Sequence, residues 1–119
     1  MEQQLNKVEL RGIVGNIRVQ EYDGSRMARI SLATNFAYKE KDGTPVIETS
    51  WHNIVAWEGR KVELDGITKG TKLRVIGRIR YQKYTDEDRV DRVSTDIIAS
   101  EVSVIGAENK MQYEMEVQP

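Results

Sequence analysis

Apolar and polar residues alternate along the most regular stretch of the chain, residues 72–82. One face of this stretch carries Leu73, Val75, Gly77, Ile79 and Tyr81, and the other carries Lys72, Arg74, Ile76, Arg78, Arg80 and Gln82. A period of two is typical of a β-strand that buries one face. The pattern therefore predicts a strand with a row of bases on its solvent side.

Four other stretches also have the pattern of strands: residues 5–19, 27–37, 46–57 and 93–105. Gly12 and Gly15 interrupt the alternation of the first, as expected at a bulge or a sharp bend. Asp23-Gly24 is a turn signal, so the first two strands are expected to form a hairpin.

The segments between the strands are polar and rich in structure breakers. Residues 39–45 and 83–92 are predicted to be charged surface loops. Residues 58–66 are the one stretch for which we predict a helix, a short one that stops at Gly66. After Gly106 the pattern is lost, which favours a short flexible tail over 107–119.

Five strands with one short helix between the third and the fourth is the element order of the five-stranded Greek-key barrel known as the OB fold. The sequence therefore predicts an all-β OB-fold domain over residues 1–106. Other small barrels also have five strands, so the element order by itself does not single out this fold.

Composition supports one globular domain without redox or metal chemistry. The chain has 119 residues, of which 39% are hydrophobic and 31% charged, and its mean hydropathy is -0.58. We expect no signal peptide and no transmembrane segment. The absence of cysteine excludes disulfides, thiolate metal sites and cysteine nucleophiles, and it fits a cytoplasmic location.

No catalytic residue, metal site or cofactor is predicted. The single histidine, His52, follows Trp51 in a strand, and no serine or carboxylate spacing makes it part of a triad. The acidic residues near position 88 lack the pattern of a calcium loop, and the glycines match no phosphate-binding or dinucleotide motif. An enzyme is therefore the least favoured class.

Aromatic residues interleaved with lysines and arginines remain as the candidate functional feature. Trp51 and Trp57 share a face of the predicted third strand, and the basic row of the fourth strand ends in Tyr84. Binding of single-stranded nucleic acid uses two kinds of group: aromatic rings, on which the nucleobases stack, and cations, which pair with the phosphates. The net charge of -1 gives no bulk attraction, so such binding has to rest on local placement. The alternative is a generic β domain, with its tryptophans in the core and its lysines and arginines on a solvated face.

Several short segments resemble the bacterial single-stranded DNA-binding proteins. They are Asn6 to Gly12 with Gly15, Ile30 to Thr34, Thr49 to Val55, Lys69 to Lys72, Val75 to Arg80 and Asp91-Arg92. Together they span about residues 5–105, in order and with spacing close to that of the family.

This resemblance implies a non-enzymatic protein that coats single-stranded DNA during replication, recombination and repair, and that forms a homotetramer. It assigns base stacking to Tyr38, Trp51, Trp57 and Tyr84. The candidate phosphate contacts are Lys7, Lys39, Arg74, Arg78, Arg80 and Lys83. Phe36 is left without a role in binding, because its neighbours Leu32 and Thr34 are compatible with a residue that closes the barrel.

The sequence departs from the family at its end. Bacterial members usually close in an acidic tip with Pro-Phe that recruits enzymes, whereas this sequence ends in Glu116-Val117-Gln118-Pro119. Recruitment through such a tip is therefore not expected. An OB-fold adaptor related to primosomal accessory factors, which binds mainly proteins, is the alternative function.

Overall fold

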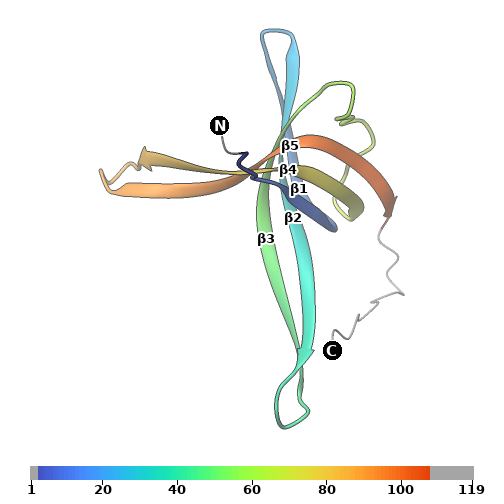
Figure 1. The fold of residues 1–119 in the computed structure, drawn as a ribbon. Helices are drawn as coiled ribbons and strands as arrows, with labels where there is room; N and C mark the ends of the chain where they lie inside the picture. Colours follow the sequence, from blue (N-terminus) through green and yellow to red (C-terminus); the bar gives the residue numbers. More distant parts are fainter. Residues whose placement is uncertain (1–2, 108–119) are drawn as a thin grey trace.

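The computed structural model describes residues 3–107 as five long strands that close into one barrel (Figure 1). Around the ring the order is β1-β2-β3-β5-β4, and only the β3–β5 contact is parallel. All five predicted strands are present. Their bounds are β1 Val8–Tyr22, β2 Ser25–Lys39, β3 Pro45–Trp57, β4 Thr71–Thr85 and β5 Asp91–Ala107.

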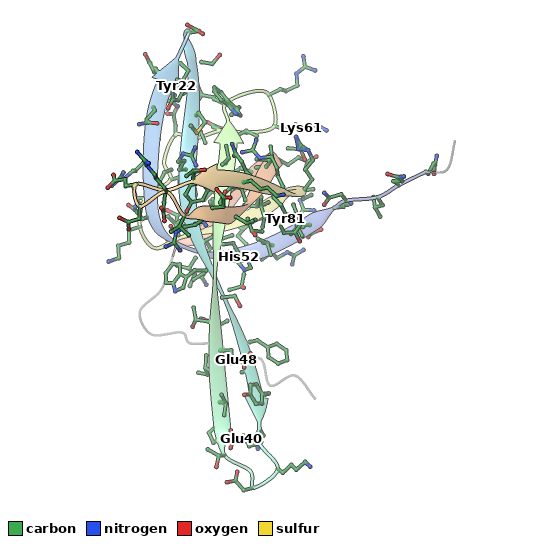
Figure 2. The ribbon with its side chains drawn as sticks, turned by 90° about the vertical axis from the view of Figure 1, so that its left-hand side faces the viewer. Tyr22, Glu40, Glu48, His52, Lys61 and Tyr81 are labelled. Atoms are coloured by element: carbon green, nitrogen blue, oxygen red, sulfur yellow. The ribbon has the colours of Figure 1, made fainter. Side chains whose placement is uncertain are left out.

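Three hairpin arms project from the barrel (Figure 1). In Figure 2, Tyr22 marks the β1–β2 arm, and Glu40 and Glu48 mark the β2–β3 arm. The β2–β3 arm is paired out to Lys39 and Pro45, and the β4–β5 arm out to Thr85 and Asp91.

The predicted surface loops are confirmed for residues 40–44 and 86–90. Residues 83–85 and 91–92, which were predicted as part of the second loop, belong instead to β4 and β5. Both faces of a two-stranded ribbon lie in solvent, so the outer ends of β4 and β5 lack the alternation of a half-buried strand. This is why they were predicted as part of a loop.

The core fills the barrel with the inward side chains of all five strands. Alternation along β4 is as predicted, since Leu73 and Val75 are fully buried and Arg74 and Arg78 lie on the outer face. The largest fully buried side chains are Ile30, Leu32, Ile54, Leu73, Val14 and Val75.

Two glycines allow strands to approach more closely than a side chain would permit. A Cβ on Gly12 would collide with the carbonyl oxygen of Ala33, and one on Gly77 with that of Ile98. Gly12 lies next to the point where β1 leaves β4 for β2, and at Gly77 the β4–β5 register shifts. The predicted bend of the first strand is confirmed here, and a bulge follows between Val14 and Asn16.

The short helix predicted over 58–66 is wrong, and no helix occurs in residues 3–107. The segment has turns at 60–61 and 65–66, joined by a short extended stretch in which Val62 and Leu64 are buried and Glu63 is exposed. A separation of two residues would put these apolar side chains on nearly opposite sides of a helix, but it puts them on one side of an extended chain. The segment adds Val62 and Leu64 to the core and forms a bridge from Val62 to Val102 on β5.

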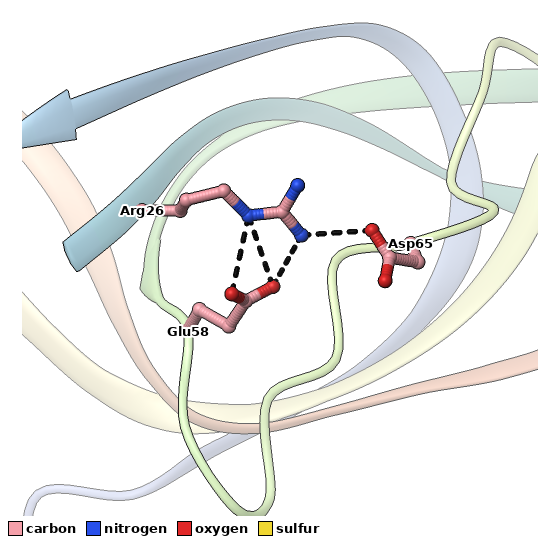
Figure 3. A network of polar contacts seen from close by, with 3 residues as sticks. All are labelled: Arg26, Glu58 and Asp65. Atoms are coloured by element: carbon pink, nitrogen blue, oxygen red, sulfur yellow. Dashed lines mark hydrogen bonds and ion pairs between the residues drawn. The ribbon is translucent and has the colours of Figure 1, made fainter. Parts of the chain in front are cut away.

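Arg26 at the start of β2 holds both ends of this segment (Figure 3). Its Nε donates to Glu58 Oε1 at 3.1 Å, and its Nη2 donates to Asp65 Oδ1 at 2.8 Å. The hydrogen bonds to Glu58 and then Asp65 raise the pKa of Arg26. The guanidinium, with donors in a fixed fork, thereby fixes a segment that has no helical hydrogen bonds of its own.

The predicted tail, except for Ala107, lies outside the described residues. Ala107 is the last residue of β5 and pairs with Thr71, so the last strand is one residue longer than the predicted domain. Within residues 3–107 there is no helix long and apolar enough to span a bilayer.

Asp86 organises the tip of the β4–β5 arm. Its Oδ1 accepts from the backbone N–H groups of Asp88 and Val90, each at 2.9 Å, and its Oδ2 accepts from Arg92. The Arg92 guanidinium, followed by the Val90 N–H, lowers the pKa of Asp86 below its usual value of 3.8. The carboxylate therefore stabilises the arm while it is ionised.

We predict that the arm loosens on acidification. The folded pKa lies below the unfolded one, so the stabilisation is complete above about pH 4 and is lost as the pH falls through the folded pKa. Asp86→Asn should remove this pH dependence. Amide exchange of Val90 in wild type and variant, followed from pH 6 to 2, measures it, and identical profiles would contradict the prediction.

Candidate nucleic-acid interface

The outer face of the β1–β2–β3 sheet carries both tryptophans. Register pairs Ala33 with Trp51 and Met27 with Trp57, and paired residues of antiparallel strands point to the same face. Trp51 and Trp57 therefore share this face, as predicted, about 20 Å apart along β3 at ~3.3 Å per residue. Trp51 is 62% exposed and Trp57 46%.

A groove of about 490 Å³ runs between this face and the β4–β5 arm. Residues of β1, β2 and β3, most of them polar or charged, form its floor, and residues of β4 and β5 form its wall. The floor includes Asn16, Arg18, Arg29, Ser31, Asn53 and Val55, and the wall includes Gln82, Tyr84, Ser94 and Asp96. Three of the four predicted rings thus lie on or beside one surface, and Tyr38 does not.

Trp51 rests on the bulge of β1. A Cβ on Gly15 would lie 2.7 Å from Cη2 of the Trp51 ring, so the ring occupies the space that a side chain would take. Gly15 lies between Val14, which pairs with Leu32, and Asn16, which pairs with Ser31. The bulge therefore supports one side of the ring while most of the ring stays in solvent.

Trp57 forms an aromatic pair that the sequence analysis missed. Its ring centroid lies 5.9 Å from that of Tyr22, with the planes at 54°. Tyr22 is the last residue of β1, and its own ring is half exposed. Tyr22 therefore extends the exposed aromatic surface at this end of the groove.

Tyr38 lies on the other face of the β2–β3 ribbon. It pairs with Val46, and it lies five residues along β2 from Ala33, the partner of Trp51. An odd separation along a strand puts two side chains on opposite faces, so Tyr38 and Trp51 point to opposite sides. Its ring lies 6.0 Å from that of Phe36, and its hydroxyl donates to Glu48 at 3.4 Å.

Two further residues of the same ribbon test expectations from the sequence. Phe36 is 51% exposed, so the interpretation that it closes the barrel is wrong. His52 faces away from Trp51 as predicted, and its Nε2 lies 2.8 Å from Thr34 Oγ1.

Two of the predicted phosphate contacts are held by carboxylates. Arg74 Nε donates to Glu9 at 3.1 Å, and this hydrogen bond lowers the pKa of Glu9. Arg80 Nη2 lies 3.5 Å from Asp96, which is buried in the wall of the groove. These pairs orient the arginines and reduce their attraction for a phosphate.

The other predicted cations lie on different surfaces. Lys7 and Arg78 line a second, largely apolar groove near the N-terminal segment. Lys83 pairs with Val93 and points to the face of the β4–β5 ribbon opposite Tyr84. Lys39 is exposed at the end of the β2–β3 ribbon. The structure therefore does not gather the six predicted cations into one patch.

The cations in the groove floor are Arg18 and Arg29, which the sequence analysis did not select. They are paired in register across β1 and β2. The sequence contained a signal for this, because a two-residue turn at Asp23-Gly24 puts Tyr22 opposite Ser25 and, counting back, Arg18 opposite Arg29.

The closed five-stranded barrel is an OB fold, and exposed aromatic rings and cations lie in and beside one of its grooves. The sequence matches the Single-strand binding protein family over residues 5–105, and the chain belongs to that family.

Curated relatives agree with this assignment. A single-stranded DNA-binding protein of Xanthomonas axonopodis pv. citri is 40% identical over 110 residues, which are 89% of this chain and 61% of the relative. One from Neisseria meningitidis serogroup A is 33% identical over 110 residues, covering 89% and 63%. The chain thus spans about three fifths of the length of these relatives.

Solved structures show the same fold. Plasmodium falciparum SSB in complex with ssDNA superimposes with a TM-score of 0.73 at 27% identity, covering 91% of this chain and 99% of that one. A deletion mutant of the single-stranded DNA binding protein from Thermus aquaticus gives a TM-score of 0.70 at 21% identity, covering 85% and 50%.

The contact between Gly15 and Trp51 leads to a prediction for a pair of glycines. In a Trp57→Phe background, which leaves Trp51 as the single tryptophan, Gly15→Ala should change the Trp51 emission because the exposed ring has to move. Gly12→Ala should instead lower the free energy of unfolding by about 1–3 kcal/mol, because its Cβ meets backbone. Fluorescence and urea denaturation measure both, and unchanged emission of Gly15→Ala would contradict the contact.

Proposed function

We propose that this protein binds and coats single-stranded DNA with little sequence preference during DNA replication, recombination and repair. The observation that carries the proposal is the arrangement of the groove, in which Trp51 and Trp57 lie exposed on one face with arginines between them. The relatives named as single-stranded DNA-binding proteins and the Plasmodium falciparum complex with ssDNA support it.

Stacking makes this binding compatible with a net charge of -1. A base stacked on an aromatic side chain contributes about 1–3 kcal/mol, and every base offers such a face. The rings thus supply affinity without bulk charge and without sequence readout. Trp51, Trp57 and Tyr84 stack bases in and beside the groove, with Tyr22 next to Trp57.

Tyr38 stacks a base on the reverse of the β2–β3 ribbon, together with Phe36. The two rings are 6.0 Å apart, and Phe36 is half exposed, so they form a small aromatic surface. A strand that also occupies the groove reaches them by crossing the edge of the ribbon, near which Lys39 lies. Lys7, Arg74, Arg78, Arg80 and Lys83 are proposed phosphate contacts outside the groove floor.

The binding unit is the barrel of residues 1–106, and it acts without covalent chemistry. We place it in the cytoplasm as a homotetramer. One feature supports an assembly through first strands: Val8–Gly12 pair with β4 alone among the described strands, which leaves their second edge open.

We predict that oligo(dT) quenches the tryptophan emission and that duplex DNA competes poorly. Trp51→Ala should weaken binding by about 1–3 kcal/mol and keep the fold, because most of the ring lies in solvent. Tyr81→Ala is the matched control, since Tyr81 is an exposed ring on the opposite face of the β4–β5 ribbon from Tyr84. Unchanged emission of the wild type at micromolar DNA would favour the protein-binding adaptor instead.

A further inference from the structure

We propose that Arg18 and Arg29 form one phosphate-binding site in the floor of the groove. The inference rests on the proposed function, since the phosphate is that of a single-stranded DNA chain. It goes further by naming a pair of residues that act together on one group.

The two arginines are held side by side by the β1–β2 ladder. They are a direct cross-strand pair, and residues so placed have Cβ atoms about 4.5–5.5 Å apart. Both are exposed and both line the groove. Their guanidinium groups can therefore reach one small anion together.

No carboxylate neutralises this pair. Among residues 3–107, the arginines at 11, 26, 74, 80 and 92 have acidic partners within 4.0 Å, whereas Arg18 and Arg29 have none. The one acid of the groove, Asp96, is buried and faces Arg80. Like charges directly opposite one another destabilise a sheet, so the site is incomplete without an anion.

The chemistry and the place of the pair both fit a nucleic-acid phosphate. Guanidinium groups present forked donors that match phosphate oxygens, often in bidentate form. The pair lies between the rows of Trp51 and Trp57, which are about 20 Å apart at ~3.3 Å per residue. A single DNA strand with bases stacked on both rings carries several phosphates across that span, so phosphates pass over the pair. The neighbouring row of Asn16, Ser31 and Asn53 adds neutral hydrogen-bonding groups.

This assignment predicts opposite effects on stability and on binding. Arg29→Gln keeps a long polar side chain and removes one charge, so it should raise the Tm of the free protein by roughly 1–5 °C at low salt. The gain should vanish at high salt, where the repulsion is screened. The same variant should weaken binding of oligo(dT). A role in the fold alone would move stability and affinity in the same direction.

The experiment compares Arg18→Gln, Arg29→Gln, the double variant and Arg60→Gln, using full-length protein and oligo(dT) over a series of salt concentrations. Arg60 lies in the segment after β3 and lines a different groove, so it is the matched control. Loss of one phosphate contact reduces the slope of log K against log salt by about 0.7. Because the two arginines share one phosphate, which either guanidinium group alone can neutralise, each single variant should lose little of that slope and the double variant should lose about 0.7 of it.

The outcomes separate the two proposals. If the wild type fails to bind oligo(dT), the proposed function itself falls. If the wild type binds and the double variant keeps its slope and affinity, the phosphate site is wrong while the function stands. A lower Tm of Arg29→Gln at low salt, together with weaker binding, would assign the pair to the fold alone.

Discussion

The barrel depends on two places where strands pass each other without a side chain between them. β1 leaves β4 for β2 at Ile13, and β4, which pairs with β5 along its whole length, shifts register between Ile76 and Gly77. Gly12 and Gly77 lie at these two points, against the backbone of Ala33 and Ile98. A third glycine, Gly15, occupies the bulge that follows and supports Trp51. The bending of β1 that closes the barrel thus also forms the surface on which the indole of Trp51 lies.

Much of the fold was predictable because half-buried strands alternate. The five strands and the bend of the first follow from that alternation and from Gly12 and Gly15. The outer ends of the β4–β5 ribbon, residues 83–85 and 91–92, were missed because a strand exposed on both faces has no apolar period. The helix was wrong for a related reason: Val62 and Leu64 are apolar at a spacing of two, which indicates extended chain.

The site was predictable where it depends on one strand and not where it depends on register between strands. That Trp51 and Trp57 share a face follows from their spacing of six on a single strand. That Tyr38 lies on the other face depends on how β2 pairs with β3, and the sequence between Lys39 and Pro45 does not determine that register. The pairing of Arg18 with Arg29 was accessible, since the tight turn at Asp23-Gly24 determines it.

The ring consists of two locally paired units, the β1–β2–β3 meander and the β4–β5 hairpin. Among the strands of the described residues, two short ladders join these units, one of six residue pairs between β1 and β4 and one of three between β3 and β5. The floor of the groove belongs to the first unit and its wall to the second. Under the proposed function, a DNA strand that contacts both floor and wall therefore links the two units a third time. The free energy of its binding then adds to the free energy that holds the two units together.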